Sequence, residues 1–352
     1  MKILVFGDIH MGDHRAFAKP DSECGTTRIR AIFDSLSWIL ELRANLHPDL
    51  VVCLGDLIHM PREADHRLLV MLAEFFDFLG EGLPPRMVQV LVGNHDTCEH
   101  PFAQTSYKWC VQRLVSRGCG LINQPVCWED PGIWFLPYYR NLEVVLEHPR
   151  RARIIFCHTD VQEHPYGGRA LGPSVEDFVA PYVFSGHVHQ PQVVSEGWGV
   201  PFQARFEYVG ALLPTSFADA GDLDFGALLL EVEERDKVKS TRLINPFAVP
   251  FIKQKVMEGE EPMLRDDAYL LVDLRGGSKW CGEQAEKLRE EPNVRVRCHV
   301  EETEVPAIEK EDPLEGEGAV GGYVDGLIDR WAAAKGGDPA RGRRLYRGED
   351  DG

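Results

Sequence analysis

Five short apolar segments each end in a cluster of polar residues, and this recurrence limits the folds open to the chain. A single cluster also fits an ordinary loop, because Gly, Asn and Asp are common turn residues. A turn does not require histidine, however, and in an open α/β sheet the carboxyl ends of the strands form the ligand-binding crevice. We therefore expect the clusters to meet at one site. They are Gly7-Asp8-Ile9-His10, Gly55-Asp56-Leu57-Ile58-His59, Gly93-Asn94-His95-Asp96, His158 and Gly186-His187-Val188-His189.

The apolar segments alternate with helical patterns over the first 160 residues or so. Strands are predicted at residues 3–6, 50–54, 87–92 and 154–157, with helices between them at 29–40, 68–79 and 106–115. From about residue 180 the strands follow one another with little helix between, at 182–184, 193–195, 206–209, 227–231 and 239–243. This rhythm predicts an α/β fold in which a second sheet, antiparallel or mixed, packs on the first.

Two proline-containing segments near residues 246–250 mark a predicted domain boundary. We expect a catalytic domain at residues 1–245. A small domain at 246–310 would contain strands at 268–274 and 294–300 and a helix near 283–290. Residues 311–352 form a tail rich in glycine and charge. One helical stripe in that tail either packs on the small domain or binds a partner, and its members are Tyr323, Leu327, Ile328 and Trp331.

The composition excludes several classes of protein. No apolar run approaches the ~20 residues of a membrane span, and no leader pattern precedes the first strand, so we expect a cytoplasmic protein without membrane contact. The nine cysteines form no C-x-x-C pair, and Cys53 and Cys157 lie in apolar strands, where buried reduced thiols are expected. The net charge of -18 argues against coating nucleic acid by bulk electrostatics, but it is compatible with a carboxylate-rich metal site.

The polar clusters offer a mixed set of imidazole, carboxylate and amide donors. In extended backbone, residues i and i+2 point the same way, so Asp8 with His10, and His187 with His189, would each face a common centre. The set suits Mn, Fe or Zn better than Ca, and it has too many donors for one ion.

Two ions can clamp the attacking and leaving oxygens of a displacement at phosphorus. Asp56, which follows a central strand, is the expected bridging ligand. His95 is the candidate proton donor to the leaving oxygen, with Asp96 placed to orient it.

The motifs D-x-H, G-D, G-N-H-D, a single His and G-H-x-H, in this order, resemble those of the calcineurin-like metallophosphoesterase superfamily over about residues 2–245. The resemblance implies a four-layer sandwich of two mixed β-sheets flanked by helices, followed here by a small α+β capping domain. It implies His95 as the catalytic proton donor. It also implies two metal ions, one on Asp8, His10, Asp56 and His189 and the other on Asp56, Asn94, His158 and His187.

Within the superfamily, G-D-I-H-M-G-D is similar to the opening motif of SbcD-type DNA exonuclease subunits, and G-D-L-I-H resembles a form found in their archaeal and eukaryotic relatives. In those relatives the extra histidine, at the position of His59, assists the nuclease reaction, although His59 also fits a residue that only caps or packs the next helix. The resemblance implies a Mn²⁺-dependent DNA exonuclease, with endonuclease activity also open and with Mg²⁺, Fe or Zn as alternative metals. It further implies a bacterial or phage-encoded homodimer whose carboxyl-terminal region binds an SbcC-type SMC-like ATPase.

Two other functions remain open from the residues. The chain also fits a phosphodiesterase or pyrophosphatase for a nucleotide-sized substrate, with the acidic extra domain as a lid. A scaffold with a vestigial metal site is the third reading, and the complete set of donors argues against it.

Overall fold

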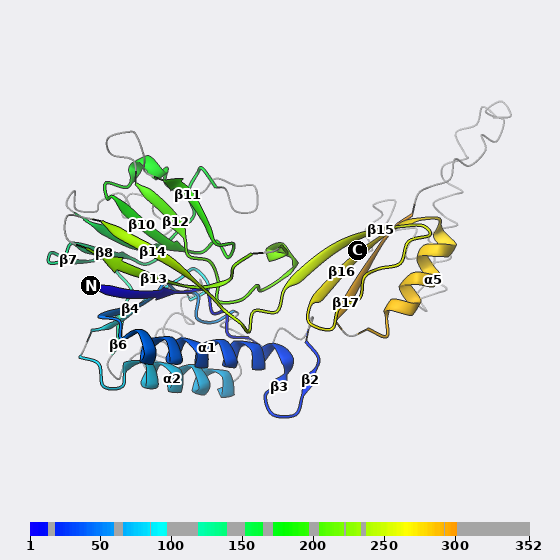
Figure 1. Ribbon diagram of the computed structural model, residues 1–352, viewed down its shortest axis with the longest axis horizontal. Coiled ribbons are helices and arrows are strands. Elements are labelled where there is room, and N and C mark those ends of the chain that lie inside the picture. The colour runs from blue at the N-terminus through cyan, green and yellow to red at the C-terminus, as the bar shows by residue number, and fades with distance from the viewer. Residues whose placement is uncertain are drawn as a thin grey trace, which may run out of the picture. The chain divides into compact units, whose positions relative to one another are not determined.

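The computed structural model describes residues 1–12, 18–59, 66–84, 86–96, 119–138, 152–164, 172–196, 204–221, 223–233, 237–291 and 293–300. Within these ranges two six-stranded sheets pack face to face, and a three-stranded sheet follows them in the chain (Figure 1). The predicted helix at 106–115, the stripe around Trp331 and the whole tail lie outside the described residues. No described helix has both the length and the apolar character needed to cross a membrane.

The first sheet has a parallel centre and an antiparallel edge, in the order β14-β13-β1-β4-β5-β6. Both faces of its central strands are buried, which explains why they read as continuous apolar runs. The parallel strands are β1 (Lys2–Phe6), β4 (Leu50–Cys53), β5 (Val88–Leu91) and β6 (Cys119–Ile122), and the antiparallel ones are β13 (Gly226–Val232) and β14 (Val238–Ile244).

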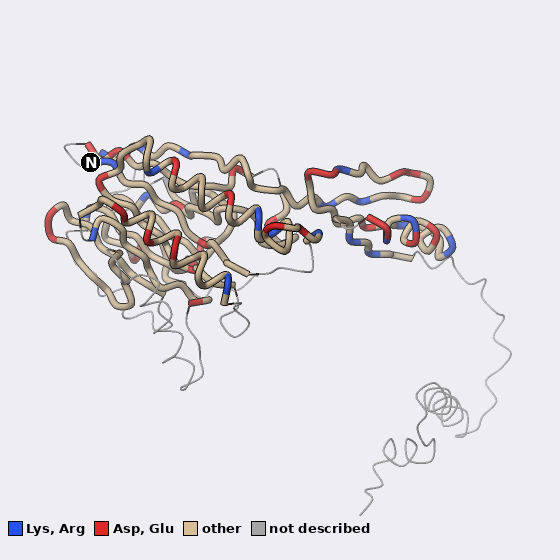
Figure 2. The backbone as a smooth tube through the Cα atoms, turned by 90° about the horizontal axis from the view of Figure 1, so that it is seen from below, with Lys and Arg blue, Asp and Glu red and all other residues tan. Residues whose placement is uncertain are grey.

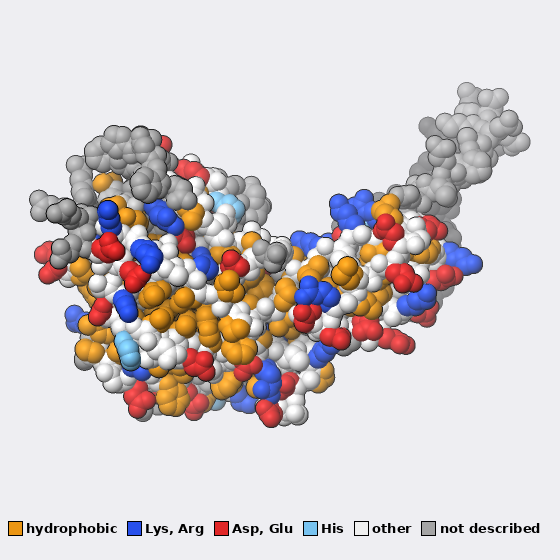
Figure 3. Space-filling model, viewed as in Figure 1, with side chains coloured by type: hydrophobic (Ala, Val, Ile, Leu, Met, Phe, Trp, Pro, Cys, Tyr) orange, Lys and Arg blue, Asp and Glu red, His pale blue; other side chains and the backbone are white. Residues whose placement is uncertain are grey.

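Two helices, α1 (Thr27–Leu46) and α2 (His66–Gly80), cover the outer face of this sheet. Helix α1 begins after Thr26, whose hydroxyl accepts a hydrogen bond from the Ile29 N–H. Hydrophobic side chains gather on the surface between α1 and the β14 edge (Figure 3), where Leu243 and Val249 pack half-buried against the same core. A short hairpin, β2 (Pro20–Asp21) and β3 (Gly25–Thr26), precedes α1.

The second sheet has the order β11-β12-β10-β9-β8-β7, with antiparallel strands only at its two edges. Ile3 and Val5 of β1 pack against Phe135 and Phe156 of this sheet, and this contact forms the core between the two layers. The strands are β7 (Val126–Trp128), β8 (Ile133–Leu136), β9 (Ile154–His158), β10 (Tyr182–Gly186), β11 (Gln192–Glu196) and β12 (Arg205–Tyr208).

The structure confirms the predicted α/β sandwich of two mixed sheets and corrects the assignment of strands to sheets. β9 belongs to the second sheet, whereas β13 and β14, predicted in the second, join the first beside β1. An apolar run indicates that a strand is buried, but it does not indicate which strand it pairs with. The prediction grouped strands by their order along the chain, and for these three strands that order is misleading. Strands β6, β7 and β8 are only three or four residues long and were not predicted.

Cys53 and Cys157 are buried and free of disulfides, as expected.

The third sheet is a small parallel one, β15 (Phe251–Met257), β16 (Tyr269–Gly276) and β17 (Val294–Val300), with α5 (Ser278–Leu288) between β16 and β17. Its core joins Cys281 and Leu288 of α5 to Leu270 and Val272 of β16. The predicted strand–helix–strand pattern is present within one or two residues for the strands. Strand β15, which begins directly after the predicted boundary, was not predicted.

Candidate metal centre

All ten predicted site residues lie among the described residues, and they gather where strands of both large sheets end. Asp8 and His10 follow β1, Asp56 follows β4, Asn94 follows β5, and His158 closes β9. These side chains are buried although they are polar: Asp56 is 0% exposed, and Asp8, His10 and His158 are each 1% exposed. Buried ionisable groups in such number call for mutual pairing or a metal ion.

The donors form two groups that share Asp56. In the first group, His10 Nε2 lies 2.9 Å from His189 Nε2 and 3.5 Å from Asp56 Oδ2. The ligand atoms of Asp8, His10 and His189 all lie within 4.8 Å of one another.

In the second group, Asn94 Oδ1 lies 2.9 Å from His158 Nε2 and 2.8 Å from His187 Nδ1. His158 Nε2 is 3.5 Å from Asp56 Oδ1. Asp56 therefore presents one oxygen to each group, which is the arrangement that a bridging ligand requires.

The backbone at these residues departs from the extended conformation expected for the i, i+2 pairs. Asp8, His10, Asp56 and His187 have φ of 49°, 47°, 51° and 81°. The strands end before these residues, and the chain then turns sharply, so His187 and His189 reach different groups of donors. Ile9 and Val188 between them are buried in the core, as predicted.

Two glycines allow the loops to approach closely. A Cβ at Gly93 would collide with the Asp56 carboxyl group. At Gly186 a Cβ would lie 2.9 Å from His158 Nδ1 and 3.0 Å from Asp8 Oδ2. Side chains at these positions would therefore occupy the space that the ligands need.

Hydrogen bonds from the outer ring nitrogen orient two of the histidines. His158 Nδ1 lies 2.7 Å from the Leu54 carbonyl oxygen, and His189 Nδ1 lies 3.2 Å from Asp219 Oδ2. Donation from Nδ1 leaves Nε2 with a lone pair facing the centre, the usual arrangement of metal-binding histidine.

Asp219 is a functional residue that sequence reasoning missed. It lies in the 3₁₀ helix η5 (Phe217–Asp219), and its Oδ2 also accepts hydrogen bonds from the N–H and hydroxyl of Thr215, both at 2.7 Å, and from the N–H of Ser216. The only local signal is a Ser-x-x-Asp capping box, which predicts a helix start and not a contact with His189, 30 positions earlier.

Tyr138 is a second residue that the sequence did not reveal. It lies two residues beyond β8, and its ring stacks on His187 with 6.3 Å between centroids and 26° between planes. The same ring meets His158 edge-on. Tyr138 thus forms an aromatic wall beside the second group of donors.

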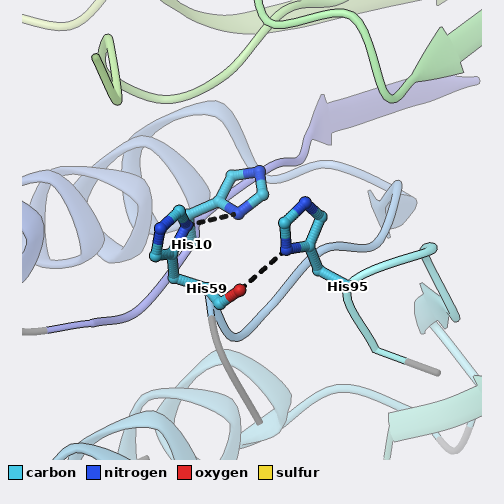
Figure 4. Close-up of side chains that lie close together, drawn as sticks. All are labelled: His10, His59 and His95. Atoms are coloured by element: carbon cyan, nitrogen blue, oxygen red, sulfur yellow. Dashed lines mark hydrogen bonds between the residues drawn. The ribbon is translucent and has the colours of Figure 1, made fainter. Parts of the chain in front are cut away.

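A third cluster joins His59 and His95 to His10 (Figure 4). His59 Nδ1 lies 3.4 Å from His10 Nδ1, and the rings of His59 and His95 stack with centroids 5.7 Å apart. His95 Nδ1 lies 2.7 Å from the carbonyl oxygen of His59, and its ring is 4.7 Å from that of His10. Both histidines therefore border the centre on the side of the first group.

Asp96 makes two backbone contacts that the sequence did not predict. Its Oδ1 accepts a hydrogen bond from the Leu57 N–H and its Oδ2 from the Gly93 N–H, both at 2.9 Å. It thereby joins the loops after β4 and β5, and the partner of His95 Nδ1 is the backbone of His59. Asp96 thereby helps to fix the backbone on which His95 stands, and its predicted role in orienting His95 stays a prediction.

The pKa values of the buried carboxyl groups and histidines in the centre are shifted in opposite directions. Burial raises the pKa of Asp8 to about 6. Burial would also raise the pKa of Asp56, but the charge of His158 and the contact with it hold that pKa below its usual range. For His158 burial opposes protonation, yet Asp56 raises its pKa to about 9, whereas burial and the charge of His158 lower the pKa of His187 to about 3. A cation entering the centre would replace the proton of His158.

The residues fit a divalent metal ion. Asp8 Oδ2 and Asp56 Oδ2 are buried and have no hydrogen-bond partner within the described part of the chain. Carboxylate oxygens in that situation need a cation to offset the loss of water. The remaining donors are imidazole nitrogens and an amide oxygen, which suit a borderline or hard divalent ion.

Comparison with known proteins agrees with this geometry. A model of the calcineurin-like phosphoesterase family matches residues 1–191. A search of curated proteins gave no match.

Three solved structures show similarity at low identity. A dimetal phosphatase from Danio rerio is 12% identical, with 66% of this chain and 93% of that chain covered and a TM-score of 0.40. The phosphoesterase Yfce from E. coli is 16% identical, with 70% and 100% covered and a TM-score of 0.32. The nuclease MPE from Pseudomonas putida is 16% identical, with 65% and 83% covered and a TM-score of 0.28. Because the family match spans more than half of the 352 residues and includes every candidate metal ligand, the chain belongs to the calcineurin-like phosphoesterase family.

Proposed function

We propose that this metallophosphoesterase is a metal-dependent DNA nuclease, the nuclease subunit of an SbcCD-like complex. The observation that carries the proposal is the cluster of His10, His59 and His95, which adds two histidines beside the candidate metal ligands. In the nuclease branch that the sequence resembles, a histidine at the position of His59 assists DNA cleavage.

The residues divide into ligands and a proton donor. Asp8, His10, Asp56 and His189 would hold one ion, and Asp56, Asn94, His158 and His187 the other. Two divalent cations, Mn²⁺ by the ligand types, would supply Lewis-acid stabilisation of a phosphoryl group and activate water.

His95 has the position of a general acid. Its Nδ1 is engaged by the carbonyl oxygen of His59, so Nε2 of the protonated ring is the atom that can donate a proton to the leaving oxygen. The stacked His59 ring limits the rotation of His95 and borders the same space. This arrangement suits the departure of an alkoxide, which a phosphodiester produces.

A small-nucleotide phosphodiesterase or pyrophosphatase is the second candidate, and the net charge of -18 favours it, because a strongly acidic protein repels a polyanion at long range. Figure 2 shows acidic and basic residues interspersed along the described backbone. Local cationic contacts with DNA are compatible with that distribution.

Cleavage of linear duplex and single-stranded DNA with Mn²⁺ tests the proposal. His95→Ala should lower kcat by about 10²–10⁴-fold, as expected for loss of a general acid, and Asp56→Ala should abolish activity. His66→Ala, an exposed histidine at the start of α2, is the matched control and should behave as wild type. Hydrolysis of bis-p-nitrophenyl phosphate without any DNA cleavage, even beside the ATPase, would favour the second candidate.

The proposed partners call for a separate experiment. Deletion of residues 311–352 should abolish co-precipitation with an SbcC-type ATPase and leave hydrolysis of small diesters unchanged. The proposed homodimer should appear in light scattering of the full chain. ATPase binding that survives the deletion would contradict the role given to the tail.

A further inference from the structure

Arg28 is a buried cation in the first turn of α1. It is 1% exposed, and its Nε, Nη1 and Nη2 have no hydrogen-bond partner among the residues that the structure describes. Burial lowers the pKa of Arg28 to about 10, so the guanidinium is still charged at neutral pH. A buried charge without hydrogen bonds opposes folding, and a function commonly accounts for its presence.

The charge of Arg28 acts on residues of the candidate active site. Its charge interacts with Asp219, which orients His189, and with Tyr269 of β16. Its charge also acts on His59: burial first, and the charges of His95, His189 and Arg28 after it, lower the pKa of that ring.

Asp219 does not satisfy this guanidinium. Its Oδ2 already accepts hydrogen bonds from two groups of Thr215 and one of Ser216 and faces His189. Among the described residues, no hydrogen bond therefore occupies the donors of Arg28, and an anion could use them.

Arg30, two positions further along the same helix, shows the contrasting case. Its Nε lies 2.8 Å from Asp21 Oδ2, and its Nη2 lies 2.6 Å from Glu23 Oε2. The same turn of helix thus carries an arginine with two carboxylate partners and a buried arginine that makes no hydrogen bond to the described residues. Arg30 is a natural control for any experiment on Arg28.

We propose that Arg28 binds a phosphate group of the substrate that neighbours the phosphate being hydrolysed. The guanidinium is a planar fork of donors that matches two phosphate oxygens. Its charge acts on both His59 and Asp219, the residue that orients His189. The ligand class is a terminal phosphate or an internal phosphodiester, which share this chemistry. Because Arg28 is buried, the surrounding side chains have to part for the phosphate to enter. The inference rests on the proposed function and assigns its substrate as one with at least two phosphates.

Two dinucleotides that differ by one phosphate test this assignment. In the full-length His95→Ala variant, chosen to slow hydrolysis, equilibrium binding of pTpT and TpT is measured by calorimetry with Mn²⁺. We expect about tenfold tighter binding of pTpT, loss of that preference when Arg28→Met is added, and retention when Arg30→Met is added instead. An equal preference with and without Arg28→Met, or no preference at all, would overturn the proposal.

Thermal unfolding separates substrate binding from a structural role. Replacing an unpartnered buried charge by an apolar side chain of similar length should leave Tm unchanged or raise it. A lower Tm together with equal weakening of pTpT and TpT would instead show that Arg28 is structural. Arg28→Lys, which keeps the charge without the fork, should retain part of the preference.

Failure of the nuclease proposal remains distinguishable from failure of this one. If the wild type cleaves neither duplex nor single-stranded DNA with Mn²⁺, the nuclease proposal is rejected. The ratio of pTpT to TpT binding still decides the role of Arg28.

Discussion

Several candidate metal ligands adopt a left-handed backbone conformation, which is strained for residues other than glycine. Among the six described non-glycine residues with positive φ, four are candidate metal ligands, and Asp8 and Asp56 are two of them. Each such residue costs about 1–3 kcal/mol, and this strain persists only where packing on both sides enforces it. The buried side chains of Ile9 and Leu57 provide that packing.

Gly93 is predicted to be essential for the position of Asp56. In Gly93→Ala the added methyl group meets the Asp56 carboxyl, so we expect a loss of about 1–3 kcal/mol in the free energy of unfolding and weaker Mn²⁺ binding. Urea unfolding and calorimetry measure the two effects. Gly282→Ala, in helix α5 with open space around its Cβ, should instead stabilise the protein by about 0.5–1 kcal/mol.

Asp219 is predicted to tune metal affinity through His189. Asp219→Asn should weaken one Mn²⁺ binding event by about 10–100-fold, because the imidazole loses a charged partner that holds its orientation. Isothermal titration with Mn²⁺ resolves this. Asp177 closes the same type of capping box in the 3₁₀ helix η4 (Val175–Asp177), so Asp177→Asn should leave metal binding unchanged. If the two variants affected Mn²⁺ binding equally, Asp219 would act only as a helix-capping residue.

At the scale of elements, the first sheet is held by hydrogen bonds at the ends of its strands as well as by packing of its apolar faces. Asn245, directly after β14, donates from Nδ2 to the Ser35 hydroxyl of α1 and to the Leu212 carbonyl oxygen, both at 2.8 Å. It is 3% exposed. This side chain ties the antiparallel edge of the sheet to the helix that covers its centre.

Asn245→Ala should therefore lower the free energy of unfolding by about 1–3 kcal/mol, because it leaves buried polar groups of α1 and the Leu212 segment unsatisfied. Chemical denaturation of the variant measures the loss. Asn123→Ala, in the exposed turn between β6 and β7, is the control and should change stability by less than about 0.5 kcal/mol. A loss that is no larger than that of the control would mean that β14 is held by its strand pairing alone.

For the molecule as a whole, metal binding and folding are coupled through the strand ends. Ligands from β1, β4, β5, β9 and β10 meet only when both sheets are packed, so an ion binds the folded chain far better than the unfolded one. At 100 times its Kd, Mn²⁺ should add about 2.7 kcal/mol to the free energy of unfolding. Thermal denaturation with increasing Mn²⁺ should show Tm rising in the wild type and staying nearly constant in Asp56→Asn. A Tm that does not respond to Mn²⁺ in the wild type would contradict the metal centre.

The sequence by itself determined the fold class and the composition of the site. Strand ends carrying Asp8, Asp56, Asn94, His158 and His187 could be recognised because short apolar runs and the polar residues after them are local features. The family match agrees with that reading. The small parallel sheet was also visible as a local alternation of strand and helix.

Only the tertiary structure decided which strands pair and which distant groups support the ligands. β13 lies beside β1 because of pairing across more than 220 residues, such as Ile3 with Leu230, which no local pattern encodes. Asp219 behind His189 and the unpaired charge of Arg28 were likewise invisible. The physical reason is that hydrophobic periodicity and turn chemistry act between near neighbours in the chain, whereas strand pairing, buried hydrogen bonds and electrostatic partners depend on where the packed chain brings remote residues together.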